Sequence, residues 1–297
     1  MRKQVLFILS LFLAINLHAE NKFVIEGSVA NVPDGLIVEL LRNEDNVGML
    51  VASDTLRNGK FRFEEETSGN GTDWMFLTAR TENYYSMILY LWVRPGSSIK
   101  ISADNLLVYT WNVESDVPEQ QTRSKILASS RDLWNEYQIL DGDYDSLRSR
   151  IKSGKYSGEE KKRQKARLDS MKQAKSMLQD RISAVELEAM AKLDVDQAWM
   201  LNYVNTAYMV NISKNKDNLE KAKALYAYIP DVWRDSFSGR EAKNVLFPQH
   251  VVERRLLMPT CMILTENCGI CLTSGADTCL STFGAVAAVR ARWPFLR

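Results

Sequence analysis

The chain has 297 residues, with 38 Lys and Arg against 37 Asp and Glu and a formal net charge of +1 at pH 7. This length suffices for one large or two ordinary domains, and 45% hydrophobic with 25% charged residues is typical of a globular protein. The balanced charge argues against a binding surface for nucleic acid or for an anionic membrane.

Residues 1–19 have the layout of a secretory signal peptide. Arg2 and Lys3 precede an apolar run from Val5 to Leu17, and we expect cleavage after Ala19. The run is short for a membrane span, so an uncleaved anchor is the weaker alternative, and no cysteine follows it for lipid attachment. The segment predicts a periplasmic or cell-envelope protein without a stable membrane span, in a compartment where disulfides persist.

Residues 20–116 predict an antiparallel β-sandwich-like domain. Short runs rich in β-branched and aromatic residues are separated by turn signals such as Pro33–Gly35 and Pro95–Gly96. Asn58-Gly59 lies between two alternating runs and predicts a hairpin, because both residues tolerate positive φ. Regular turns between short strands favour a sandwich or an open barrel.

Residues 117–247 predict a helical domain. The stretch 157–194 is rich in helix formers, and two further helices are predicted over 196–210 and 218–230, the second ended by Pro230. The fold class is therefore α+β, with the sandwich-like domain first and the helices after it. One apolar stripe of the long helical stretch is formed by Leu168, Met171, Leu178, Ile182 and Val185.

Residues 248–297 differ in character and are predicted to be a linker and an irregular tail. All four cysteines lie between Cys261 and Cys279, and only 5 of the 39 residues from Pro259 to Arg297 are charged. The stretch shows neither strand alternation nor a helical stripe. It does not resemble a packed domain.

Cys268-Gly269-Ile270-Cys271 is the first candidate site. A dithiol redox pair needs a leading thiolate stabilised by a helix N-terminus, and no helix is predicted after Cys271. A structural disulfide or free thiols are therefore favoured over a redox pair, and we assign no catalytic residue. A zinc site formed by Cys261, Cys268, Cys271 and Cys279 is also disfavoured, because a four-cysteine ribbon needs a second Cys-x-x-Cys pair. No metal and no cofactor is assigned.

Two charged motifs and one histidine remain. Asp141–Asp145 alternates carboxylates like a calcium loop, but Ser146 and Lys152 stand where that loop needs Gly and Glu, so we expect an interhelical turn with solvated acids. Glu159–Arg167 is expected to be a solvated helix face rather than a basic binding patch. His250 is the only histidine after signal cleavage, and no nucleophile motif accompanies it.

The segments "FVIEGSVANVPDG", "DTLRNGKFRFE", "LWVRPGSSIKISA" and "YAYIPDVWRDSFSGREAKNVLFP" carry a resemblance. Over residues 20–250 the chain resembles the β-rich domain and helical segment that precede the thioredoxin-like domain in envelope thiol-disulfide oxidoreductases of the TlpA/ResA and AhpC/TSA type. The resemblance implies disulfide exchange by a Trp-x-x-x-Cys-x-x-Cys motif further along the chain, with the N-terminal parts docking envelope proteins. This chain has no such motif.

The tail is compatible with the same gene read in another frame. When the third base of each codon is joined to the first two bases of the next, allowed codons from Leu272 onward give "DFRGRYMLVDFWSSGCGPCTMALPE". Phe283-Gly284 can then encode the Trp, and Ala287-Ala288 and Arg290-Ala291 can encode the two Cys. The written residues fix the last two bases of these three codons, and only the first base is free.

The sequence therefore predicts the accessory, non-catalytic part of an exported thioredoxin-like oxidoreductase whose catalytic domain is missing from the written chain. One alternative is a stand-alone envelope binding protein. The other is a weak disulfide oxidoreductase that uses Cys268 and Cys271.

Overall fold

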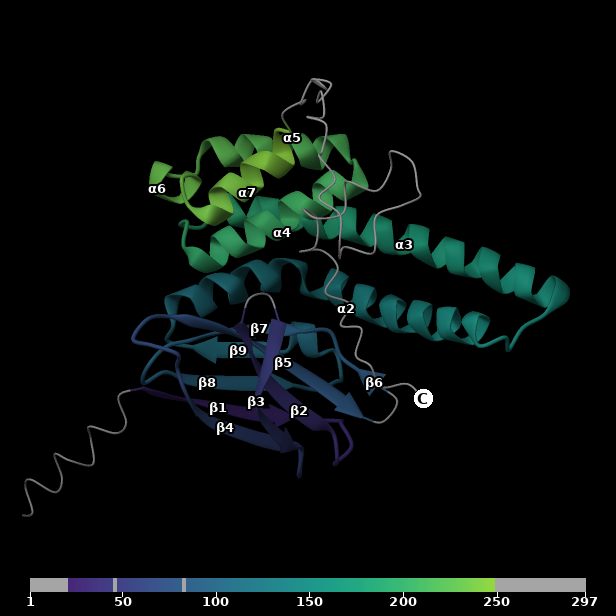
Figure 1. The fold of residues 1–297 in the computed structure, drawn as a ribbon, viewed down its shortest axis with the longest axis horizontal. Helices are drawn as coiled ribbons and strands as arrows, with labels where there is room; N and C mark the ends of the chain where they lie inside the picture. Colours follow the sequence, from purple (N-terminus) through teal and green to yellow (C-terminus); the bar gives the residue numbers. More distant parts are fainter. Residues whose placement is uncertain (1–20, 45–46, 82–83, 249–297) are drawn as a thin grey trace, which may run out of the picture. The chain divides into compact units, whose positions relative to one another are not determined.

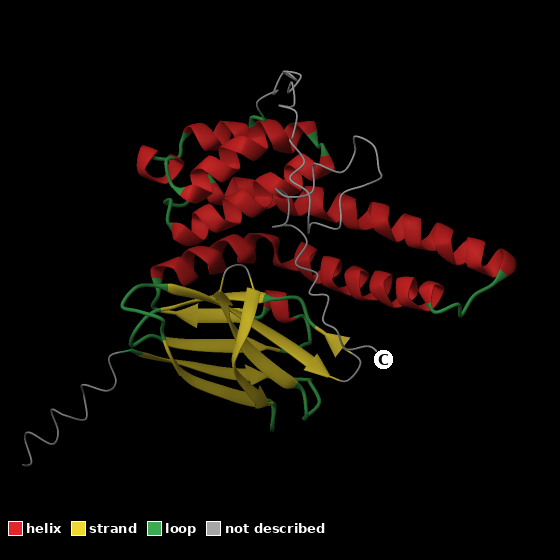
Figure 2. Ribbon diagram, in the orientation of Figure 1, coloured by secondary structure: helices red, strands yellow, loops and turns green. Residues whose placement is uncertain are grey.

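The computed structural model describes residues 21–44, 47–81 and 84–248 (Figure 1). Strands fill the first part of this range and helices fill the rest (Figure 2), so the predicted α+β class, with two mainly antiparallel sheets followed by helices, is confirmed. The strands and the helices through Leu246 belong to one compact unit. The predicted signal peptide, residues 1–19, and the four cysteines of the tail lie outside the described residues.

Two sheets form the N-terminal part. The first has the order β4-β1-β8-β9, in which β1 and β8 run parallel and the other pairs are antiparallel. Its strands are β1 (Lys22–Val29), β4 (Lys60–Glu66), β8 (Ser98–Ala103) and β9 (Asn112–Ser115). The second is antiparallel with the order β3-β2-β5-β6, and β7 also pairs with β5. Its strands are β2 (Ile37–Glu44), β3 (Val47–Thr55), β5 (Asp73–Thr81), β6 (Tyr84–Tyr85) and β7 (Leu89–Val93).

The two sheets share one hydrophobic core, which makes them a sandwich. In β1 every second residue is buried, and in β4 Phe61 and Phe63 are buried between exposed neighbours, as the period of a half-buried strand requires. The core combines both sheets, because Ile25 and Phe63 from the first cluster with Leu40, Leu77 and residues of β7 from the second. Complete burial of such a side chain stabilises the fold by about 1.5–3 kcal/mol.

The tight turn predicted at Asn58-Gly59 is confirmed, with Arg57 and Lys60 paired across it, but the flanking strands β3 and β4 then pair in different sheets. Asn58 has φ 51° and Gly59 has φ 70°, both in the left-handed region. A Cβ at Gly59 would lie 2.4 Å from the carbonyl oxygen of Val29, so glycine is required there for conformation and for space.

The helical part begins at Pro118, at the first helical position, where the missing proline N–H costs nothing. A 3-10 turn, Val108–Thr110, precedes it. The helices are α2 (Pro118–Lys152), α3 (Gly158–Met190), α4 (Gln197–Ser213), α5 (Lys216–Ala227), α6 (Asp231–Arg234) and α7 (Phe237–Leu246). At the start of α4, the side chain of Asp196 accepts a hydrogen bond from the Trp199 amide at 2.7 Å, which satisfies one free donor of the first turn.

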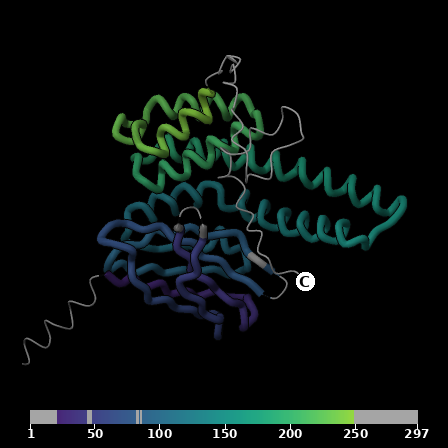
Figure 3. The backbone as a smooth tube through the Cα atoms, in the orientation of Figure 1, coloured from purple at the N-terminus to yellow at the C-terminus, as the bar shows by residue number. Residues whose placement is uncertain are grey.

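The long helices α2 and α3 lie side by side and are joined by a short turn (Figure 3). Ser130 contacts Glu186 and Asp141 contacts Lys175, so the two helices run antiparallel. A second hydrophobic core combines α2 to α5 and α7 around Trp199 and Tyr203. In the predicted stripe of α3, Leu178 and Ile182 are buried, which confirms the face that the sequence indicates.

Candidate functional site

The candidates drawn from the tail cannot be placed. Cys261, Cys268, Cys271, Cys279 and His250 lie outside the described residues. Within the described ranges, no group of three or more His, Cys, Asp or Glu side chains is arranged to hold a metal ion.

The expected interhelical turn at Asp141–Asp145 is wrong. This segment lies inside α2, and the turn that joins α2 to α3 follows Lys152 instead. Lys175 of α3 pairs with Asp141, and its ammonium group lies 4.7 Å from the ring centroid of Tyr144. These contacts between α2 and α3 favour a continuous helix through the acidic stretch. A helix cannot surround a calcium ion as a calcium-binding loop does.

The solvated helix face predicted at Glu159–Arg167 is confirmed. The segment forms the first turns of α3, where Glu159 pairs with Lys162 and Glu160 pairs with Arg163 three residues apart. Lys162 and Arg163 are each 77% exposed, and such pairs belong to a solvated helix face.

The most unusual chemistry in the described residues is a buried arginine at the start of α2. Arg123 is 3% exposed. Its Nη1 donates a hydrogen bond to Oδ1 of Asn202 on α4, and its Nη2 donates one to the hydroxyl of Tyr109, both at 2.8 Å. The guanidinium carbon also lies 5.2 Å from the ring centroid of Tyr109 and 5.8 Å from that of Tyr90 on β7. One charged side chain therefore bonds three segments of the fold to α2.

A buried carboxylate accompanies this arginine. Glu186 of α3 is 6% exposed, and its Oε1 accepts hydrogen bonds from Ser130 Oγ at 2.8 Å and from Trp134 Nε1 at 2.7 Å. Burial raises the pKa of the Glu186 carboxyl, and the attraction of Arg123 and the two hydrogen bonds offset only part of that rise. Arg123 and Glu186 thus attract each other while each is hydrogen-bonded to neutral groups.

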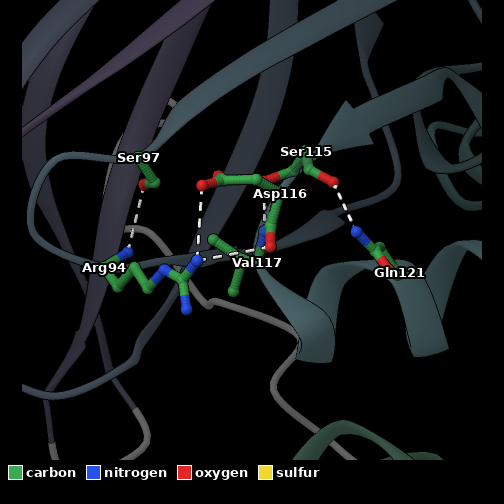
Figure 4. Close-up of polar contacts among 6 residues, drawn as sticks. All are labelled: Arg94, Ser97, Ser115, Asp116, Val117 and Gln121. Atoms are coloured by element: carbon green, nitrogen blue, oxygen red, sulfur yellow. Dashed lines mark hydrogen bonds and ion pairs between the residues drawn. The ribbon is translucent and has the colours of Figure 1, made fainter.

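Polar contacts hold the connection between β9 and α2 (Figure 4). Arg94, in the turn after β7, donates to both the backbone and the side-chain oxygens of Asp116, at 3.4 and 3.3 Å. Ser115 Oγ accepts from the Val117 amide, and its carbonyl accepts from Gln121 in the first turn of α2. Contacts from the turn after β7 and from the first turn of α2 therefore hold the chain in place between β9 and α2.

A cluster of five buried residues and two half-buried ones joins the sandwich to the helices. The buried members are Tyr109, Arg123, Ser130, Glu186 and Asn202, and the half-buried members are Tyr90 and Trp134. Burial raises the pKa of the Tyr109 hydroxyl, so Tyr109 stays protonated at neutral pH and accepts the hydrogen bond of Arg123 through its oxygen. No thiol and no histidine belongs to the cluster. Its polar groups face one another, which suits a structural role better than proton transfer to a substrate.

Sequence reasoning missed Arg123 and Glu186, although both occupy stripe positions. Glu186 follows the apolar positions Leu178 and Ile182 at a further spacing of four, and Arg123 precedes Ile126 and Leu127 by one turn. A charge on the apolar face of each of two consecutive helices is a signal for a buried polar pair.

A second candidate is an open groove of about 760 Å³ on the outer face of the first sheet. Four side chains cross its strands in one row with alternating charge, because Glu26 is opposite both Arg62 and Lys100, and Lys100 is opposite Glu114. Arg62 Nε lies 3.6 Å from Glu26 Oε1. Such a row suits a ligand that carries both charge signs, but its acids and bases also satisfy each other across the sheet.

Comparisons with known proteins bring no relative. No family model matches the chain, and neither a curated protein nor a solved structure matches it. In the parts of the chain that the structure describes, no helix combines the length and the apolarity needed to cross a membrane.

Proposed function

We propose that residues 21–248 form the accessory, non-catalytic part of an exported thioredoxin-like thiol-disulfide oxidoreductase. In this proposal the protein is located in the periplasm or cell envelope, and the sandwich and helices dock envelope proteins. In the same proposal, electron transfer belongs to a thioredoxin-like domain outside residues 21–248.

The hydrogen bonds of the two buried charged groups support this role. Arg123 and Glu186 have the burial and the electrostatic coupling found in active sites, but all of their hydrogen bonds connect one structural element to another. Neither residue lines the groove on the first sheet. A rigid connection of this kind suits a part that holds partners at a fixed geometry.

A stand-alone envelope binding protein is the second candidate. The groove on the first sheet favours it, since Lys100, Lys60 and Arg57 line an open surface together with carboxylates. Under this alternative the groove is the functional site, and no catalytic domain is involved.

Reduction of insulin disulfides by dithiothreitol, followed as turbidity, tests the proposal. We expect the purified chain and its Cys268→Ser variant both to leave the rate at that of dithiothreitol alone, while a thioredoxin accelerates it in the same assay. Acceleration by the unmodified chain that disappears in Cys268→Ser would contradict the proposal and would assign the chemistry to Cys268 and Cys271.

A further inference from the structure

Two of the sheet edges are closed by side chains of α2. At the β9 edge, Ser124 Oγ donates to the carbonyl oxygen of Val113 at 3.1 Å. At the β7 edge, the amide of Trp92 donates to Oε1 of Gln120 at 2.9 Å. Each bond occupies a backbone group that a further strand would need.

The β4 edge is closed by residues of the second sheet. Oδ2 of Asp54 on β3 accepts from the amide of Arg62 at 2.9 Å, and Arg42 of β2 donates to the carbonyl oxygen of Glu66 at 2.5 Å. The strand β6 pairs with the end of β5 that β7 leaves unpaired. It has two residues, and so short an edge strand offers few backbone groups to a partner.

The outer edge of β3 is different. β3 pairs with β2 on one side, and no hydrogen bond from the described residues reaches the backbone of Gly48–Ser53 on the other side. This stretch contains no charged residue and no proline. Two of its neighbouring side chains, Met49 and Leu50, are 49% and 60% exposed.

The edge continues into an apolar row on the sheet. Leu50 is opposite Leu41, Leu41 is opposite Phe76, and Phe76 is opposite Tyr90, so one row of large side chains crosses the sheet from β7 to its open edge. Successive strand residues point to opposite faces. A strand added at β3 would therefore meet Leu50 on one face and Met49 on the other.

We propose that the open edge of β3 pairs antiparallel with the same edge of a second copy of this chain. Edge pairing needs an open edge on both partners, and among the described strands the β3 edge is the one that another copy can offer. Because Gly48–Ser53 is uncharged, an antiparallel pairing within this stretch opposes no like charges. The contact is isologous, so it closes as a two-fold dimer and does not extend into a fibre.

The pairing is short. The register of β3 against β2 shifts at Leu40/Leu41, which leaves Val51 as an extra residue, and such a bulge twists an edge and interrupts its regular pairing. A pairing of this length covers less than the roughly 1,200–2,000 Å² of stable complexes. We therefore expect a weak dimer that dissociates on dilution.

Sedimentation velocity of the full chain over roughly 1 µM to 1 mM tests the proposal in a range that suits weak association. We expect a concentration-dependent monomer–dimer equilibrium, and a double variant Met49→Lys/Leu50→Lys with a dissociation constant raised at least about tenfold. Met177→Lys is the control, since Met177 on α3 is an apolar residue that is 68% exposed, more than Met49 and Leu50. Circular dichroism checks that each variant is folded.

Hydrogen exchange of β3 at low and high protein concentration completes the test. We expect the amides of residues 48–53 to exchange more slowly at the concentration where the dimer forms. A monomer throughout the range would overturn the proposal, and so would a dimer that the double variant leaves intact. Protection of β3 that does not change with concentration would also overturn it, because the occupant would then be another part of the same chain.

Discussion

Arg123 of α2 donates a hydrogen bond of 2.8 Å to the hydroxyl of Tyr109, which lies in the 3-10 turn before β9. A charge that is 3% exposed is thus used to connect the sandwich to the helical part. Burying a charge costs free energy unless partners compensate it. The partners of Arg123 come from several elements, so the cluster is stable only when sandwich and helices are assembled together.

Replacing Arg123 should destabilise the whole protein. Arg123→Met keeps the side-chain length but leaves Glu186, Asn202 and Tyr109 without their cation or donor, and we expect the free energy of unfolding to fall by about 3–5 kcal/mol. Urea denaturation measures the change. Arg181→Met is the control, because Arg181 is 62% exposed and 4.0 Å from Glu136, and its loss should be within about 0.5 kcal/mol. Equal effects of the two variants would contradict the structural role of the cluster.

The buried carboxyl should give stability an identifiable pH dependence. Burial raises the pKa of Glu186 in the folded state, so the folded protein binds this proton more tightly than the unfolded chain does. The resulting stabilisation is complete below the unfolded pKa of about 4.3 and is lost as the pH rises through the folded pKa.

Glu186→Gln removes this titration and keeps the shape of the side chain. We expect the stability of the wild type relative to Glu186→Gln to decrease as the pH rises from about 4.3 toward neutrality. Urea denaturation of both proteins at several pH values measures the difference, in which the other titrating groups cancel. A difference that is flat with pH, or that grows with pH, would contradict the raised pKa.

Two glycine-to-alanine changes should have opposite signs. At Gly239 of α7 an added Cβ would lie 2.1 Å from the carbonyl oxygen of Trp233 and 2.4 Å from that of Arg234, so we expect Gly239→Ala to cost about 1–3 kcal/mol or more. At Gly142 of α2 nothing lies within 4 Å of an added Cβ, so Gly142→Ala should stabilise by about 0.5–1 kcal/mol. Thermal and urea unfolding test both. Destabilisation by Gly142→Ala would show that residue 142 is not inside a regular helix.

The charge row on the first sheet should respond to reversal of Lys100. Lys100→Glu places three acids side by side with Glu26 and Glu114, and we expect a loss of about 0.2–1 kcal/mol that salt reduces. Lys100→Gln removes the charge without adding repulsion and should cost less. If salt does not affect the difference between the two variants, the row contributes no electrostatic stability.

Local sequence signals predicted much of this fold. The turn at Asn58-Gly59 follows from backbone conformation alone, whereas the divergence of β3 and β4 into different sheets has no local signal. The alternation in β1 and the stripe through Leu178 and Ile182 follow from one buried face per element. The prediction of a turn at Asp141–Asp145 is wrong because the contact that supports a helix there is not local. It comes from Lys175, which is distant in sequence. The partners of Arg123 and Glu186 come from separate elements as well, so stripe positions could suggest that these charges are buried but could not say what they contact.

The nucleotide sequence over Leu272–Arg297 tests the central claim most directly, namely that residues 21–248 are the accessory part of an oxidoreductase whose redox cysteines lie in another frame. The account predicts that the frame formed by each third base and the next two bases is open and encodes Trp, three residues, then Cys-x-x-Cys. Stop codons in that frame, or codons that give no such motif, would contradict it.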